Sequence, residues 1–124
     1  MDDQLALRIQ LFRAGGQVPP QVADFVVAEL AALDAEGARV TEETAGLLTS
    51  HLMTALTRLL DGEPINEFPT DEQIAAELSG HPEAVERARA VAVRAQAVLG
   101  TALPESEVNF LGMHLAVLAQ HSTH

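Results

Sequence analysis

The sequence contains no Cys, Trp, Tyr or Lys. Without Cys, the chain cannot form disulfides, thiolate metal sites or a thiol nucleophile. Without Lys, it cannot carry the P-loop of nucleotide-binding proteins, which requires a Lys after its glycine-rich loop. Aromatic residues make up only 3% against 48% for hydrophobic residues, so the core must be built from Leu, Val and Ala. This composition is typical of a helix bundle.

Positive charge is also scarce. The 7 basic residues are all Arg, and they stand against 18 acidic residues, which gives a formal net charge of -11. Such a surface repels a phosphate backbone, so we expect no direct binding to nucleic acid. The first residues, Met1-Asp2-Asp3, are acidic where a secretory signal is basic, and no apolar run approaches the ~18 residues of a membrane span. The sequence therefore predicts a cytoplasmic protein with no membrane contact.

The hydrophobic pattern is helical and shows no strand alternation. Apolar spacings of three and four residues, with prolines at helix starts and glycines at helix ends, predict helices over about 3–13, 20–36, 42–61, 70–78, 82–99 and 105–120. At 124 residues, the chain is long enough for one core but too short for two ordinary domains. We therefore predict an all-α fold, a compact bundle of five to six helices.

The same pattern sets the expected boundaries along the chain. We expect an N-terminal helix and turn over 1–19, a single helical domain over 20–121 and a frayed tail over 122–124. The stretch Glu63–Pro69 contains two prolines and has no helical period. It is therefore predicted to be a connecting loop and the best candidate for a hinge.

Histidine is the side chain whose charge and nucleophilicity are adjustable near neutral pH, so the five histidines are candidate functional residues. Three have a sequence context that favours an ordinary surface role: His81 lies in a helix-start turn, and His121 and His124 lie in the tail. His51 and His114 differ, because each lies within an apolar stretch near the middle of a long predicted helix. We therefore take His51 and His114 as the candidate functional residues.

The spacing of charged residues adds to this picture. Arg58 follows His51 by seven residues and Glu107 precedes His114 by seven, which places each pair on one helix face. If the two faces meet, the four side chains would gather in one polar cleft that is costly to bury unpaired. The spacing is equally compatible with a plain ion pair between Arg58 and Glu107, with histidines that only satisfy local backbone groups.

Other chemistries have weaker signals. The two histidines and Glu107 could supply three metal ligands, but helical metal motifs place their ligands three or four residues apart on one helix. The sequence shows no hydrolase nucleophile elbow and no carboxylate pair in an apolar pocket. We therefore predict no metal site, no cofactor and no enzymatic activity.

The two histidines lie in motifs of recognisable form. The first motif reads Leu47-Leu48-Thr49-Ser50-His51-Leu52, followed by Arg58 and by Gly62-Glu63-Pro64-Ile65. The second reads Leu103-Pro104-Glu105-Ser106-Glu107-Val108-Asn109-Phe110-Leu111-Gly112-Met113-His114-Leu115. In this order, and about sixty residues apart, they resemble the two histidine helices of the PTS regulation domain (PRD) family. The resemblance covers roughly residues 20–120.

This resemblance implies a helical bundle, usually a homodimer, whose two histidines are phosphorylated by the phosphocarrier protein or an enzyme II component of the sugar phosphotransferase system. By position these are His51 and His114, with Arg58 and Glu107 at the family's recurring charged positions. The expected function is that of a stand-alone PRD, which controls carbohydrate-related transcription or metabolism through a partner protein. One departure from the family is Ser50, where many members have Asp directly before the first histidine.

The implied activity fits the residue types. A neutral imidazole can accept a phosphoryl group, Arg58 could pair with the added charge and Glu107 would repel it. A switch then needs only two packings of similar energy. Because of Ser50, an alternative stays open, a helical dimerisation or assembly module that is not phosphorylated. A third hypothesis, metal-assisted hydrolysis in the histidine cleft, requires a bound transition metal.

Overall fold

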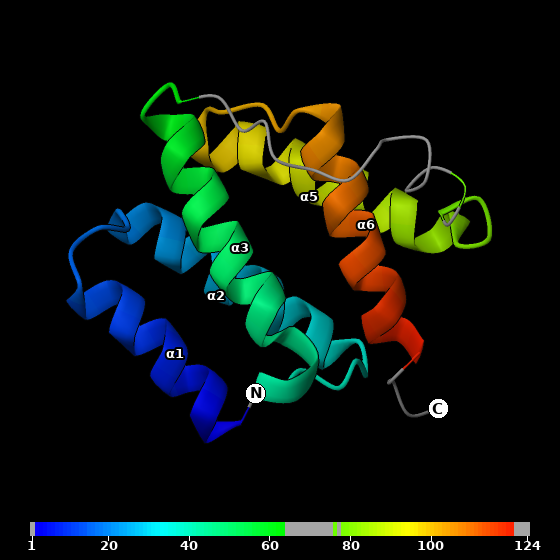
Figure 1. Ribbon diagram of the computed structural model, residues 1–124, viewed down its shortest axis with the longest axis horizontal. Helices are drawn as coiled ribbons and strands as arrows, with labels where there is room; N and C mark the ends of the chain where they lie inside the picture. The colour runs from blue at the N-terminus through cyan, green and yellow to red at the C-terminus, as the bar shows by residue number, and fades with distance from the viewer. Residues whose placement is uncertain (1, 64–75, 77, 121–124) are drawn as a thin grey trace.

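The protein folds as a bundle of α-helices in the computed structural model, which describes residues 2–63, 76 and 78–120. Its helices are α1 (Asp3–Ala14), α2 (Pro20–Ala35), α3 (Glu42–Leu60), α5 (Pro82–Leu99) and α6 (Glu105–Gln120) (Figure 1). No strand occurs within the described ranges. The predicted all-α bundle is therefore confirmed. The tail over 122–124 and most of the loop and short helix expected between 63 and 78 lie outside the described residues.

The helix boundaries follow local signals in the sequence. Thr41 caps α3: its Oγ1 accepts from the backbone N–H of Thr44, and its own N–H donates to Oγ1 of Thr44 at 2.9 Å. Helix α5 begins at Pro82 and ends before Gly100, whose φ of 74° is left-handed and therefore suits glycine. These starts and ends are the ones that the sequence predicts.

The core is formed by the apolar stripes of the helices. The stripe predicted for α6 is buried at all four positions: Val108, Leu111, Leu115 and Leu118. It packs in one cluster with leucines of α3 and with Ala88, Val91 and Ala95 of α5. Small residues on α5 let α6 approach closely, and Phe25 of α2 is the aromatic residue that the same cluster buries.

Helix α1 is apolar on two opposite sides. Leu5 and Ile9, four residues apart, share one face and are buried. Leu7 and Leu11 lie on the opposite side and are 59% and 64% exposed. Because α1 packs on α3 and α2 from one side only, its second leucine edge faces solvent.

Helix α3 runs diagonally through the middle of the bundle as seen in Figure 1. It contacts α1, α2 and α6, whereas α5 packs mainly along α6 and touches α2. The contact between α3 and α6 therefore joins the two helices that carry the candidate histidines.

The described helices carry charged residues on their outer faces. None of them combines the length and the apolar character that a membrane crossing would require.

Candidate functional site

His51 of α3 and Glu107 of α6 form a hydrogen-bonded pair between the two helices. The ring Nε2 of His51 lies 2.8 Å from Oε2 and 3.1 Å from Oε1 of Glu107. The Glu107 side chain is 2% exposed and that of His51 is 24% exposed. A carboxylate removed from water in this way needs a donor, and the N–H of His51 supplies it.

Phe110 lies between the two candidate histidines. Its ring stacks on that of His51 with a centroid distance of 4.1 Å and an interplanar angle of 28°. The ring of His114 also contacts the ring of Phe110, with a centroid distance of 4.6 Å and an interplanar angle of 49°. The three α6 residues share one helix face, because Phe110 follows Glu107 by three positions and His114 follows Phe110 by four.

The environment of His114 disfavours its charged form. Burial is the main cause that lowers the pKa of His114 below its ordinary value of 6.5, and repulsion by His51 adds to it. At neutral pH, the ring is therefore uncharged and keeps a lone pair on one nitrogen.

Three of the four predicted site residues come together, namely His51, Glu107 and His114. Arg58 does not join them: it is exposed, and among the described residues no ion pair or hydrogen bond of its side chain is found. The alternative ion pair between Arg58 and Glu107 is wrong, since the Glu107 carboxylate is bonded to His51.

The remaining histidines lie apart from this cluster. His81 is the N-cap residue of α5, partly exposed and without a capping hydrogen bond from its side chain. His121 and His124 are outside the described residues.

Arg8 of α1 is a neighbour of the site that the sequence reasoning did not identify. Its Nε donates to both oxygens of Glu42 at 2.9 and 3.0 Å, and its Nη1 donates to Oγ of Ser50 at 2.7 Å. The hydrogen bond to Glu42 raises the pKa of Arg8, and the same bond lowers the pKa of Glu42. No pattern in the sequence pairs α1 with α3, so this contact had no local signal. Phe110 did have one, because it precedes His114 by a single helical turn.

A metal centre is not formed by these residues. Among the residues that the structure describes, no three His, Asp or Glu side chains are grouped so that they could hold a metal ion. His51, Glu107 and His114 fall within that part of the chain, so the three-ligand set that their types would allow is not assembled.

No family model, curated protein or solved structure matches the chain. We call the side chains of His51, Glu107, Phe110 and His114, which lie together at the contact between α3 and α6, the histidine cluster.

Proposed function

We propose that the chain is a PRD-type regulatory module, phosphorylated on histidine by the sugar phosphotransferase system. In this role it would control carbohydrate-related transcription or metabolism through a partner protein in the cytoplasm. The observation that carries the proposal is the histidine cluster, which unites both motif histidines at the contact between α3 and α6.

His114 has the properties of a phosphoryl acceptor. The lowered pKa of His114 leaves its ring neutral at physiological pH, so that a nitrogen lone pair is available. In the transfer, this lone pair attacks the phosphorus of a donor phosphohistidine. A new P–N bond forms while the donor's P–N bond breaks, and the donor imidazole leaves with the electron pair of that bond.

Phosphorylation of His51 would act directly on the helix contact. The added group carries about -1.5 to -2 charges at neutral pH and would stand beside the buried Glu107 carboxylate. Repulsion then replaces the hydrogen bond that joins α3 to α6. Arg58, exposed two turns further along α3, offers positive charge to a phosphate that turns away from Glu107. The result is a change in the packing of the two helices, which a partner protein can read.

The test is incubation with phosphoenolpyruvate, enzyme I and phosphocarrier protein from the organism of origin. Intact mass and site mapping under alkaline conditions, which preserve phosphohistidine, then locate the phosphate. We expect it on His114 and on His51, with uptake abolished stepwise in His114→Ala and His51→Ala. His81→Ala is the matched control and should be phosphorylated as the wild type. If the phosphocarrier is charged and this chain remains unmodified, the proposal is wrong.

One observation favours the second candidate, a helical dimerisation module that is not phosphorylated. Leu7 and Leu11 on α1 and Leu47 on α3 are 59%, 64% and 75% exposed. These leucines lie on the two helices that Arg8 ties together, and a second protein surface that covered them would remove their apolar side chains from water.

This second candidate predicts self-association that depends on the leucines. In analytical ultracentrifugation, the wild type should sediment as a dimer and Leu11→Glu as a monomer. Val93→Glu, at an exposed apolar position of α5 far along the chain, serves as the control and should remain dimeric. A monomeric wild type at high concentration would exclude the assembly function.

A further inference from the structure

His51 and His114 lie close enough for a charge on one ring to act on the other. Their ring centroids are 4.1 and 4.6 Å from that of Phe110, so the two imidazoles are at most about 8.7 Å apart. The Debye length at physiological ionic strength is about 8 Å, and partly buried charges are screened less than exposed ones. The two candidate phosphorylation sites therefore form one electrostatic unit.

The charge of this unit is already negative before any phosphorylation. The Glu107 carboxylate is 2% exposed and lies 2.8 Å from Nε2 of His51. The nearest cation along α3 is Arg58, two turns from His51 and exposed. One arginine neutralises only part of a single phosphate group, which carries about -1.5 to -2 charges at neutral pH. A first phosphoryl group thus leaves the histidine cluster with a larger net negative charge.

This charge opposes a second phosphoryl group. The donor of that group is itself an anion, and the product would hold two phosphates on neighbouring rings of α3 and α6. With the effective dielectric constant of about 20 that describes charge pairs near a protein surface, their repulsion at this distance exceeds the thermal energy. Both the approach of the donor and the doubly phosphorylated product are therefore disfavoured.

A proton adds to this effect at His51. With Glu107 bonded to its Nε2 and a phosphate on His114, the His51 ring would have two anions near it. Both anions favour the protonated imidazolium. An imidazolium is a donor at both nitrogens and has no lone pair with which to attack phosphorus. A phosphate on His114 thus also makes His51 a poorer nucleophile.

We infer that the two histidines exclude each other, so that a phosphoryl group on either one suppresses transfer to the other. The identity of the physiological donor rests on the proposed function, whereas the coupling belongs to the histidine cluster and applies to any phosphoryl donor. The chain then has two alternative singly phosphorylated forms. A phosphate on His114 leaves the bond between His51 and Glu107 in place, and a phosphate on His51 breaks it. A partner protein can therefore distinguish which histidine was modified.

The experiment uses phosphoramidate, a small donor that phosphorylates histidine without a second protein. A nitrogen lone pair of the imidazole attacks phosphorus, a P–N bond to the ring forms, the donor's own P–N bond breaks and ammonia leaves with its electron pair. Two full-length variants each keep two histidines. The cluster variant keeps His51 and His114 and carries His81→Gln, His121→Gln and His124→Gln. The control variant keeps His81 and His114 and carries His51→Gln, whose amide can still donate to Glu107, with the same two tail substitutions.

The readout compares double with single modification in each variant. Site mapping under alkaline conditions gives the occupancy of each histidine, and intact mass gives the fraction of chains with two phosphates. For independent sites, that fraction equals the product of the two occupancies. We expect this product in the control variant and a fraction at least about tenfold lower in the cluster variant. In concentrated urea, where the helices separate, the cluster variant should also reach the product.

Three results would overturn the inference. A doubly modified fraction equal to the product in the folded cluster variant would show that the sites are independent. An equal deficit in the control variant would place its cause outside the pair of His51 and His114. Modification of His81 with none on the cluster histidines would remove them as acceptors. A failure of the phosphotransferase proteins to modify the wild type bears only on the proposed function, because phosphoramidate does not need them.

Discussion

Arg8 donates a 2.7 Å hydrogen bond from Nη1 to Oγ of Ser50, the residue directly before His51. The N-terminal helix is thereby fastened to α3 beside the first candidate histidine. Under the proposed resemblance to PRDs, Ser50 stands where many members of that family carry Asp. In this chain, the side chain before the histidine is thus an uncharged acceptor of a hydrogen bond from α1, and not a carboxylate available to the imidazole.

Replacement of Arg8 tests how much α1 depends on this contact. Arg8→Gln removes the donors to Glu42 and Ser50 together, so the midpoint of urea unfolding should fall. Arg13→Gln on the same helix is the control, because the pair of Arg13 with Asp24 is more open to solvent. Equal midpoints for the two variants would mean that α1 is held by Leu5 and Ile9 alone.

Replacement of Glu107 should lower the stability of the protein more than replacement of Glu105, the other glutamate of α6. Glu107→Gln keeps an acceptor for His51 but loses the charge, so we expect a loss of about 1–2 kcal/mol in the free energy of unfolding. Urea titrations at pH 7.5 would measure it. Glu105→Gln, at an exposed position one half-turn earlier, should change the free energy much less. A neutral result at Glu107 would show that the buried pair adds nothing to the contact between α3 and α6.

Leu115 tests the core stripe of α6. It is 4% exposed, so Leu115→Ala should cost about 2–5 kcal/mol through lost burial and an enlarged cavity. Val117→Ala, two positions on and 48% exposed, is the matched control and should cost far less. Chemical denaturation of both variants would compare them, and similar costs would contradict the assigned helix face.

The pKa of His114 predicts a dependence of stability on pH. Because that pKa is lowered in the folded state, the unfolded chain takes up a proton first as the pH falls below about 6.5. The folded state therefore loses stability below that pH, by at most about 1.4 kcal/mol per pH unit for one proton. Well above pH 7 the ring is neutral in both the folded and the unfolded state, so it does not make the free energy of unfolding depend on pH.

The variant His114→Gln should remove this part of the pH dependence. Urea unfolding of wild type and variant at pH 7.5, 6.5 and 5.5 would give the difference between their curves. The difference should begin to change between pH 7.5 and 6.5, where the histidine of the unfolded chain becomes half protonated, and should change most between pH 6.5 and 5.5. Parallel curves throughout would mean that His114 titrates alike in the folded and unfolded states.

Much of the fold could be predicted because its signals are local. Thr41, Pro82 and Gly100 mark helix ends by their own hydrogen-bonding and backbone preferences, and the α6 stripe follows from spacing alone. Spacing also predicted which side chains share a face. For that reason His114 and Glu107 could be associated before their helix was placed against α3.

The pairings between helices could not be predicted in the same way. Glu107 had two possible partners, His51 and Arg58, which lie two turns apart on the same helix. The position along α3 at which α6 crosses it decides between them, and that position depends on side-chain packing along the whole contact. The contacts of Arg8, Arg87 and Arg94 were missed for the same reason, since each joins residues that are more than thirty positions apart.

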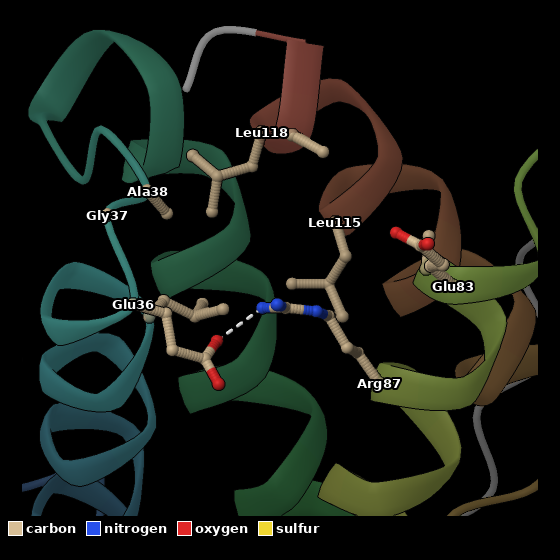
Figure 2. Close-up of a pocket in the computed structure, with 10 residues that line it drawn as sticks. Glu36, Gly37, Ala38, Glu83, Arg87, Leu115 and Leu118 are labelled. Carbon is tan, nitrogen blue, oxygen red and sulfur yellow. Dashed lines mark hydrogen bonds and ion pairs between the residues drawn. The ribbon is translucent and has the colours of Figure 1, made fainter. Parts of the chain in front are cut away.

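The joint between α2 and α5 has a consequence for how the molecule responds to salt. Two ion pairs join these helices, Glu29–Arg94 and Glu36–Arg87, and both side chains of the Glu36–Arg87 pair, which Figure 2 shows, are about half exposed. Mobile ions screen such exposed charges but barely affect apolar packing. Rising ionic strength should thus weaken the Glu36–Arg87 contact while leaving the apolar packing between the same two helices almost unchanged.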